Sequence, residues 1–318
     1  RGLGDVYKRQ LQKIDALINE VEKVILGKRD VIQLTVAALL AGGHVLFEDI
    51  PGVGKTMLVK SLAKAIQSDY KRVQFTPDLL PNDILGVSIF NSENQQFEFR
   101  PGPIFTSVLL ADEINRTTPR TQAALLEAMS ENHVTIDNQT YALSPHFFVL
   151  ATQNPIEYEG TYPLPEAQLD RFLFRLHIGY PAFQDELALL IGQRQQSLNQ
   201  IQTILTSQEV TALKQMVDQV FVDNQVARYA LQLVQASRNH NAIDLGISPR
   251  GGIAFLKGAK ALALTEGRTY VTPQDLQRIL PAVFGHRLLL KGGITASQES
   301  LSEIMKQMIQ RVPVPVRR

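Results

Sequence analysis

The strongest chemical signal in the sequence is a glycine-rich run that leads into a lysine and a threonine. Two glycines let the backbone fold around an anion with its N–H groups pointing inward, and a helix that begins there adds the positive end of its dipole. At this spacing the lysine would reach the β- and γ-phosphates of a nucleotide, and the threonine hydroxyl would hold Mg²⁺. The candidate phosphate-binding residues are Pro51, Gly52, Val53, Gly54, Lys55, Thr56 and Met57.

One position departs from the general phosphate-loop pattern G-x-x-x-x-G-K-[ST]. That pattern would place glycine at position 49, where this chain has Asp49. The remaining Gly-x-Gly-Lys-Thr is intact, so we keep the prediction of a phosphate loop.

An apolar run at 108–111 ends in two acids, Asp112 and Glu113. Asp112 could lie on Mg²⁺ directly or one shell away, and Glu113 could orient the attacking water or accept its proton. In a chain without a phosphate loop, an apolar run that ends in two acids would be no more than an ordinary strand end. Together with that loop, the acid pair indicates water as the nucleophile and therefore hydrolysis.

Three further polar residues have a functional and an ordinary interpretation. Asn154 follows an apolar strand and could position the water, or could simply form a turn before Pro155. Arg171 could stabilise the transferring phosphoryl group of a neighbouring subunit, or pair with Asp170. Arg250 opens a helix and could touch the γ-phosphate of its own subunit, or lie in solvent.

The elements that must position these residues alternate between strands and helices. Short apolar strands separated by helical stretches predict a mostly parallel sheet with helices on both faces, which is a three-layer α/β fold. Two insertions read as hairpins, and after about residue 181 the pattern is helical, with capping boxes at Thr206, Thr272 and Thr295. The expected strands are 44–47, 72–75, 107–111, 147–152 and 172–178, and the hairpins are 87–100 and 134–143.

We therefore expect a core domain over 11–181 with two hairpin inserts, followed by a smaller all-helical domain over 182–318. Residues 2–10 resemble a translated sequencing-adapter artefact, so we expect 1–10 to be a non-native segment; the alternative is a native flexible terminus.

Composition limits the classes of function. The chain has 318 residues, 44% hydrophobic and 20% charged, and a net charge of +1, which gives no argument for a nucleic acid partner. With no cysteine there is no disulfide, thiolate metal site or cysteine nucleophile, which fits a reducing compartment. No membrane-spanning run and no signal-peptide pattern are found, so we expect a cytoplasmic protein.

His44 has no partner histidines at the spacing of metal ligands, so we interpret it as a structural residue.

The order and spacing of these motifs resemble AAA+ ATPases, and more narrowly the MoxR family. The resemblance covers about residues 11–310. It also accommodates Asp49, because an acidic residue there is common in that family. The motifs that carry it are 44–56 (HVLFEDIPGVGKT), 74–81 (QFTPDLLP), 112–116 (DEINR), 151–155 (ATQNP), 166–172 (EAQLDRF) and 248–250 (SPR).

The resemblance implies ATP and Mg²⁺ as ligands. It makes Lys55 and Thr56 the phosphate and Mg²⁺ residues, Asp112 and Glu113 the Walker B pair, and Asn154 sensor 1. Arg171 becomes the arginine finger and Arg250 sensor 2. Residues 24–27, including Ile25 and Leu26, would wall the adenine pocket.

The resemblance also implies assembly and partners. Such proteins are typically hexameric rings whose two hairpins face the central pore. They are chaperone-like and mature or activate partner proteins, often ones with von Willebrand factor A domains. No residue of this chain identifies the client.

Three alternatives share some of these features. A magnesium-chelatase-type motor subunit would depend on a porphyrin-binding partner. A DNA-processing AAA+ protein would show DNA-stimulated hydrolysis, but the hairpins carry Glu93, Glu98 and Asp137 and only Arg100 as a basic residue. A non-catalytic nucleotide-dependent scaffold would bind nucleotide but would release no phosphate in a hydrolysis assay.

Overall fold

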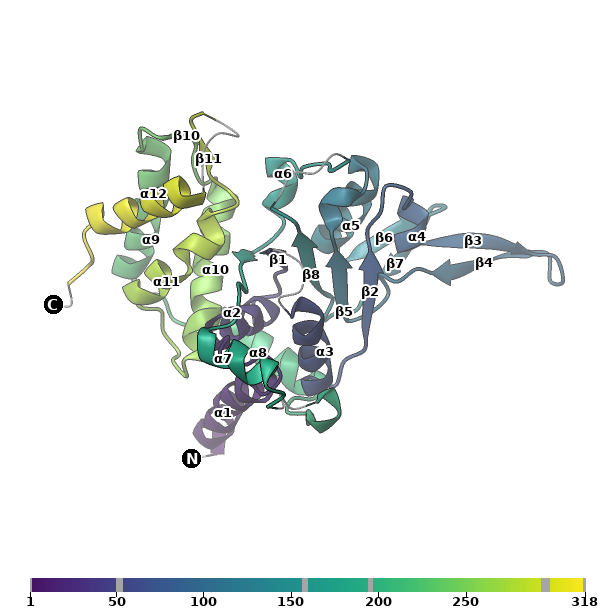
Figure 1. The fold of residues 1–318 in the computed structure, drawn as a ribbon, viewed down its shortest axis with the longest axis horizontal. Helices are drawn as coiled ribbons and strands as arrows, with labels where there is room; N and C mark the ends of the chain where they lie inside the picture. The colour runs from purple at the N-terminus through teal and green to yellow at the C-terminus, as the bar shows by residue number, and fades with distance from the viewer. Residues whose placement is uncertain (1, 50–53, 156–159, 194–196, 293–297, 317–318) are drawn as a thin grey trace.

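A five-stranded sheet forms the centre of the molecule, with the strand order β2-β5-β8-β1-β9 (Figure 1). The computed structural model describes residues 2–49, 54–155, 160–193, 197–292 and 298–316. All four strand pairings in the sheet are parallel, which confirms the predicted α/β class. The strands are β1 (Val45–Glu48), β2 (Tyr70–Gln74), β5 (Val108–Asp112), β8 (Phe148–Gln153) and β9 (Phe174–Leu176).

Successive residues of the central strands point to opposite faces of the sheet, as the twofold side-chain period of a strand requires. Phe47, Leu110 and Leu150 belong to one buried cluster, whereas Leu46 and Val149 belong to the other. The fold therefore has three layers. The first cluster packs against α1 (Gly2–Glu22), α2 (Arg29–Leu40) and α3 (Lys55–Ala65), and the second against α4 (Pro81–Leu85) and α5 (Pro119–Glu131).

Two antiparallel hairpins interrupt the core, as predicted from the sequence. The first pairs β3 (Gly86–Asn91) with β4 (Gln96–Pro101) and projects from the body (Figure 1). The second pairs β6 (His133–Ile136) with β7 (Gln139–Ala142). Gly86 lies at the base of the first hairpin with φ 111°, and a Cβ there would collide with the Arg100 carbonyl oxygen, so only glycine fits.

Aromatic side chains run along one face of the β3–β4 hairpin. Phe90 and Phe97 meet edge to face with ring centroids 5.3 Å apart, and Phe97 is 73% exposed. Phe99, nearer the base, stacks on Tyr141 of β7 at 4.0 Å. Stacked rings of this kind hold the two hairpins together where they leave the core.

The described C-terminal residues are mainly helical, with an isolated bridge between Phe221 and Tyr270 and a small strand pair that was not predicted from the sequence. β10 (Ile243–Leu245) and β11 (Leu289–Leu290) are too short to give a periodic signal. The capping boxes at Thr206 and Thr272 are present, while Thr295 lies outside the described residues. The helices are α6 (Glu166–Leu169, before β9), α7 (Phe183–Leu190), α8 (Ser207–Asp218), α9 (Asn224–Asn239), α10 (Pro249–Thr265), α11 (Pro273–Phe284) and α12 (Gln298–Arg311).

Arg287, just after α11, ties the C-terminal helices to the sheet. Its buried guanidinium donates to the Asp170 carboxylate at 2.7 Å and to the carbonyl oxygens of Phe172 at 2.8 Å and Leu173 at 3.1 Å. Neighbouring His286 lies 2.8 Å from the same Phe172 oxygen. This polar junction fixes the start of β9 relative to the C-terminal helices.

Residues 2–10, expected from the sequence to be non-native, are part of a helix. α1 runs from Gly2 to Glu22, and Tyr7 packs against the buried cluster. Because α2 packs on α10, the N-terminal helices contact both the sheet and the C-terminal helices. The domain division at about residue 181 stays a prediction. None of the described helices combines the length and apolar character that a membrane crossing requires.

Candidate nucleotide site

The first turn of α3 contains the described part of the predicted phosphate loop. Gly54 caps the helix with φ 94°, a left-handed conformation that favours glycine, and Lys55, Thr56 and Met57 follow it. The backbone N–H groups of a first helical turn have no partner within the helix and can bind an anion. Pro51, Gly52 and Val53 lie outside the described residues.

Lys55 lies in a half-buried place surrounded by acids. Its Nζ donates to the Asp49 carbonyl oxygen at 3.2 Å. Burial lowers the pKa of Lys55, while the charges of Asp49, Asp112 and Glu113 oppose that shift. The structure therefore brings the predicted lysine together with both predicted acids.

Asp112 ends β5 with both carboxylate oxygens engaged. Oδ1 accepts a hydrogen bond from the Thr152 hydroxyl at 2.6 Å, and Oδ2 pairs with Arg72 at 2.7 Å. The same Thr152 oxygen accepts the Glu113 N–H at 2.9 Å. Thr152 on β8 thus fixes the relative positions of the two acids. Arg72 and Thr152 were not predicted as site residues, although β2 and β8 are the two neighbours of β5 in the sheet.

Glu113 has an unusual backbone conformation. Its φ of 57° and ψ of 54° are left-handed, a state that costs a residue with a side chain about 1–3 kcal/mol. Its carboxylate accepts hydrogen bonds from Gln74 at 3.0 Å and Arg116 at 3.3 Å. These contacts hold the carboxylate at the strand end, the place where a base acting on water is expected.

The three remaining predicted polar residues lie in different settings. Asn154 directly follows β8, and its carbonyl oxygen accepts from Asn115 at 3.2 Å. Arg171 donates to the Leu126 carbonyl oxygen and the Ser130 hydroxyl of α5, both at 3.0 Å, so Asp170 is not its partner.

Asp170 instead pairs with Arg287 and, more loosely at 4.0 Å, with Arg250 at the start of α10. The Arg250 side chain is 70% exposed, so its ordinary interpretation as a solvated helix-start arginine fits this structure. Arg250 does not line the cavity beside α3.

A cavity of about 200 Å³ opens beside the first turn of α3. Apolar side chains dominate its wall, and the polar side chains in it belong to Lys28 and Asp185. The predicted Ile25 and Leu26 are both in this wall, next to Gly54. The wall consists of Val24, Ile25, Leu26, Lys28, Gly54, Met57, Gly179, Pro181, Asp185 and Leu189.

The structure explains the aspartate where the general pattern has glycine. The buried Asp49 carboxylate accepts the backbone N–H of Ile178 at 2.7 Å and that of Gly179 at 3.1 Å. Gly179 lines the cavity, and the Tyr180 carbonyl oxygen accepts from Lys28 at 2.7 Å. Asp49 therefore fastens the end of β1 to the segment that forms one cavity wall.

The donor set at this site suits Mg²⁺ bound to a nucleotide. Among the described residues no group of three or more histidines and acids could hold a metal ion without further ligands. Mg²⁺ usually takes one or two protein oxygens, phosphate oxygens and water, and Thr56 with Asp112 can supply the protein oxygens.

The comparisons with known proteins agree with this geometry. Residues 44–174 match the model of the ATPase family associated with various cellular activities (AAA), and residues 235–308 match the AAA lid domain. YeaC of Bacillus subtilis is 49% identical over 95% of this chain and 94% of its own. Chaperone MoxR1 of Mycobacterium tuberculosis is 37% identical over 96% of this chain and 83% of its own.

The crystal structure of an ATPase candidate from Cytophaga hutchinsonii has the same fold. It superposes with a TM-score of 0.85 at 36% identity, covering 98% of this chain and 97% of that one. The relatives cover nearly the whole chain and the two family models cover the core and the lid separately. The chain belongs to the MoxR family of AAA+ ATPases.

Proposed function

We propose that this protein hydrolyses ATP with Mg²⁺ at the site beside α3. The observation that carries the proposal is the convergence of Lys55, Asp112 and Glu113 at the edge of the sheet next to the cavity that contains Ile25 and Leu26. An adenine ring would occupy the cavity and the phosphates would extend along the first turn of α3.

The chain's own residues would divide the chemistry. The α3 N–H groups and Lys55 bind the phosphates, and Mg²⁺ held by Thr56 and Asp112 would neutralise phosphate charge. Glu113, oriented by Gln74 and Arg116, accepts the proton of the attacking water as the water oxygen bonds to the γ-phosphorus, while the bond from that phosphorus to the β–γ bridging oxygen breaks and ADP leaves. Asn154 helps to position that water at the end of β8.

The site would be completed by a second subunit. Arg171 of a neighbour would supply its guanidinium to the transferring phosphoryl group, an effect of about 10³–10⁵ in rate in comparable sites. Within the described residues its Nη1 alone is engaged, so other N–H donors are available. Arg250 would leave its loose contact with Asp170 for the γ-phosphate.

ATP hydrolysis would drive conformational changes in partner proteins, here called clients. In a hexameric ring the β3–β4 hairpins would carry the exposed Phe90 and Phe97 towards a client. The relative named as a chaperone supports remodelling or maturation of partner proteins as the role. The proposed clients are von Willebrand factor A domain proteins, and the proposed location is the cytoplasm.

Glu113→Gln tests the proposal. The variant should bind MgATP with unchanged affinity, because the amide keeps the size of the side chain, and should lose about 10²–10⁴ of turnover in a phosphate-release assay. Glu93→Gln, an exposed acid on the hairpin, is the matched control and should turn over normally. Normal turnover by Glu113→Gln would remove Glu113 from its proposed function, and absence of MgATP binding by the wild type would refute the proposal itself.

A further inference from the structure

The helix α7 carries an apolar stripe that nothing in the described part of the chain covers. Phe183, Leu187 and Leu190 recur at the i, i+4 and i+7 spacing of one helix face. Phe183 is 77% and Leu190 80% exposed, and Ile191 just beyond the helix is 62% exposed. Glu186 lies on the same face, and the helix contains no lysine or arginine.

The opposite face of α7 belongs to the nucleotide cavity. Asp185 and Leu189, four residues apart, are both in its wall. The Asp185 carboxylate touches Gly27, where a Cβ would collide with it. One helix thus has one face towards the proposed nucleotide and one face towards solvent.

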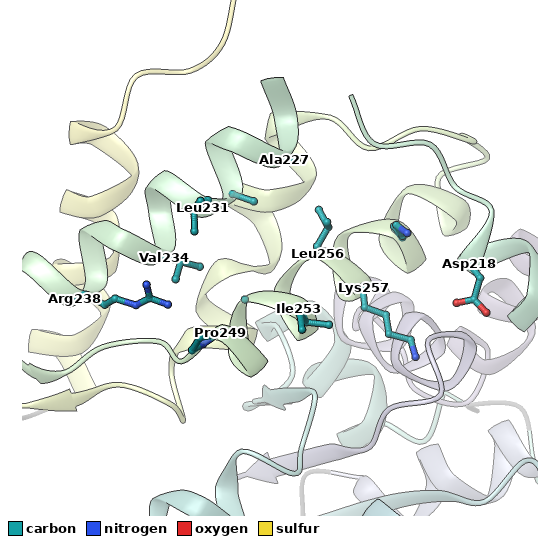
Figure 2. A pocket seen from close by; sticks show the side chains of 12 residues that line it. Asp218, Ala227, Leu231, Val234, Arg238, Pro249, Ile253, Leu256 and Lys257 are labelled. Atoms are coloured by element: carbon teal, nitrogen blue, oxygen red, sulfur yellow. The ribbon is translucent and has the colours of Figure 1, made fainter. Parts of the chain in front are cut away.

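A groove of complementary character lies between α9 and α10, with a volume of about 520 Å³. Figure 2 shows Leu231 and Val234 of α9 facing Ile253 of α10 across it, with Arg238 at one end and Lys257 towards the other. Ile253 is 72% and Leu231 52% exposed. The middle of the groove is therefore apolar and open.

The rim of this groove is predominantly basic. Arg238, Lys257 and Lys260 line it together with one acid, Asp218. Arg238 Nε donates to the Ile247 carbonyl oxygen at 2.8 Å, and in the described part of the chain the three cations have no carboxylate partner. Lys257 also lies close enough to Lys214 to help lower the pKa of Lys214. The groove therefore suits an apolar helix that carries acidic side chains.

We propose that α7 of one copy docks in the α9–α10 groove of a second copy of this chain. The apolar stripe of α7 meets the apolar middle of the groove, and the acidic Glu186 faces its basic rim. An eight-residue helix is about 12 Å long, so a groove between two longer helices can take it. The groove of the same chain is not an alternative, because Asp185 and Leu189 keep α7 at the cavity.

The contact joins two different surfaces, so it can either occur twice in a twofold dimer or propagate head-to-tail from copy to copy. The ring of the proposed function requires the head-to-tail form, which closes when the rotation between copies does. The docking itself does not depend on catalysis. If the proposed function holds, the docking also makes assembly depend on nucleotide, because a nucleotide bound in the cavity would order α7 and so favour the contact.

Two single substitutions test the docking. Leu190→Asp places a charge in the apolar stripe of α7 and leaves the groove unchanged. Ile253→Asp places a charge in the α9–α10 groove and leaves α7 unchanged. Each places a charge where a large exposed apolar side chain would become buried, so association of each variant with itself should weaken at least about tenfold. Val316→Asp, at an 87% exposed apolar residue of the C-terminal tail, is the control and should assemble as the wild type does.

Sedimentation velocity of the full chain with MgATP is the measurement, and the mixture of the two variants is the decisive sample. At a concentration just sufficient for the wild type to assemble, each variant alone should be mostly monomeric, and the mixture should form a heterodimer that grows no further, because it contains one intact helix–groove contact. Variants that assemble as the wild type does, a monomeric wild type, or a mixture that stays monomeric would each overturn the proposal.

Nucleotide binding separates this test from the proposed function. Both variants lie outside the nucleotide cavity and, compared at a dilution at which the wild type is also monomeric, should bind a fluorescent ATP analogue with wild-type affinity. Loss of binding by the wild type would refute the ATPase proposal while leaving the sedimentation result to decide the docking.

Discussion

Asp49→Ala is a sharp test of how the nucleotide site is held together. Asp49 is 8% exposed, and its carboxylate accepts two backbone N–H groups from the segment that walls the cavity. Hydrogen bonds to a charged group contribute about 1.5–3 kcal/mol each, and a buried N–H left without an acceptor costs about 1–3 kcal/mol. We therefore expect the free energy of unfolding to fall by about 3–5 kcal/mol.

The same substitution should weaken nucleotide binding. Without Asp49 the backbone at Ile178 and Gly179 loses its attachment to β1, and Gly179 lines the cavity. We expect the Kd for MgATP to rise about tenfold or more, because a loss of about 1.4 kcal/mol of binding free energy corresponds to a tenfold rise in Kd. Asp49→Gly, which restores the general phosphate-loop glycine, should be equally harmful.

Urea unfolding and titration with a fluorescent ATP analogue measure the two effects. Asp244→Ala removes an exposed acid of β10 and serves as the matched control, with a change in stability within about 0.5 kcal/mol. If Asp49→Gly were as stable as the wild type and bound nucleotide as tightly, the buried carboxylate would not have the structural function assigned to it.

The remaining predictions concern three other buried or cavity-lining groups. Arg287→Ala leaves the Asp170 carboxylate without its buried partner and should lower stability by about 3–5 kcal/mol in urea unfolding, whereas exposed Arg228→Ala should not. Burial lowers the pKa of His44 to about 4, so the unfolded chain takes up a proton that the folded chain does not. The contribution of His44 to stability should therefore be full above about pH 6.5 and fall by up to about 1.4 kcal/mol per pH unit towards pH 4; buried His286, whose pKa is also lowered, adds a slope of its own that His44→Gln leaves in place. With adenine in the cavity as proposed, the Asp185 carboxylate would accept a hydrogen bond from the adenine amino group, which guanine replaces with a carbonyl oxygen, so Asp185→Ala should lower the preference for ATP over GTP about tenfold in competition binding.

Much of the fold was predictable because its signals are local. A few neighbouring residues are enough to predict each of these features: the apolar strands, the glycine turn before α3, and the capping boxes at Thr206 and Thr272. The two acids at the end of β5 were predictable for the same reason. The pairing of β10 with β11 was not, since strands of two and three residues carry no periodicity.

The partners of the site residues were not predictable, because they come from distant parts of the chain. Arg72 reaches Asp112 from a neighbouring strand, and Arg287 reaches Asp170 from the C-terminal helices. The sequence offered Asp170 as a partner of Arg171, yet two other arginines occupy that carboxylate. Sequence spacing predicts which residues share an element but not which elements meet.

Mixing two inactive variants tests the shared catalytic site most directly. Arg171→Ala keeps Glu113 but lacks the arginine that its neighbour needs, while Glu113→Gln keeps the arginine but cannot activate water. In a random equimolar ring about a quarter of the interfaces would combine an intact Glu113 with an intact Arg171 from the next copy, so the mixture should release phosphate although neither variant does alone. A mixture no more active than the two variants measured separately, or an Arg171→Ala protein that hydrolyses ATP at the wild-type rate, would contradict a site built from two subunits.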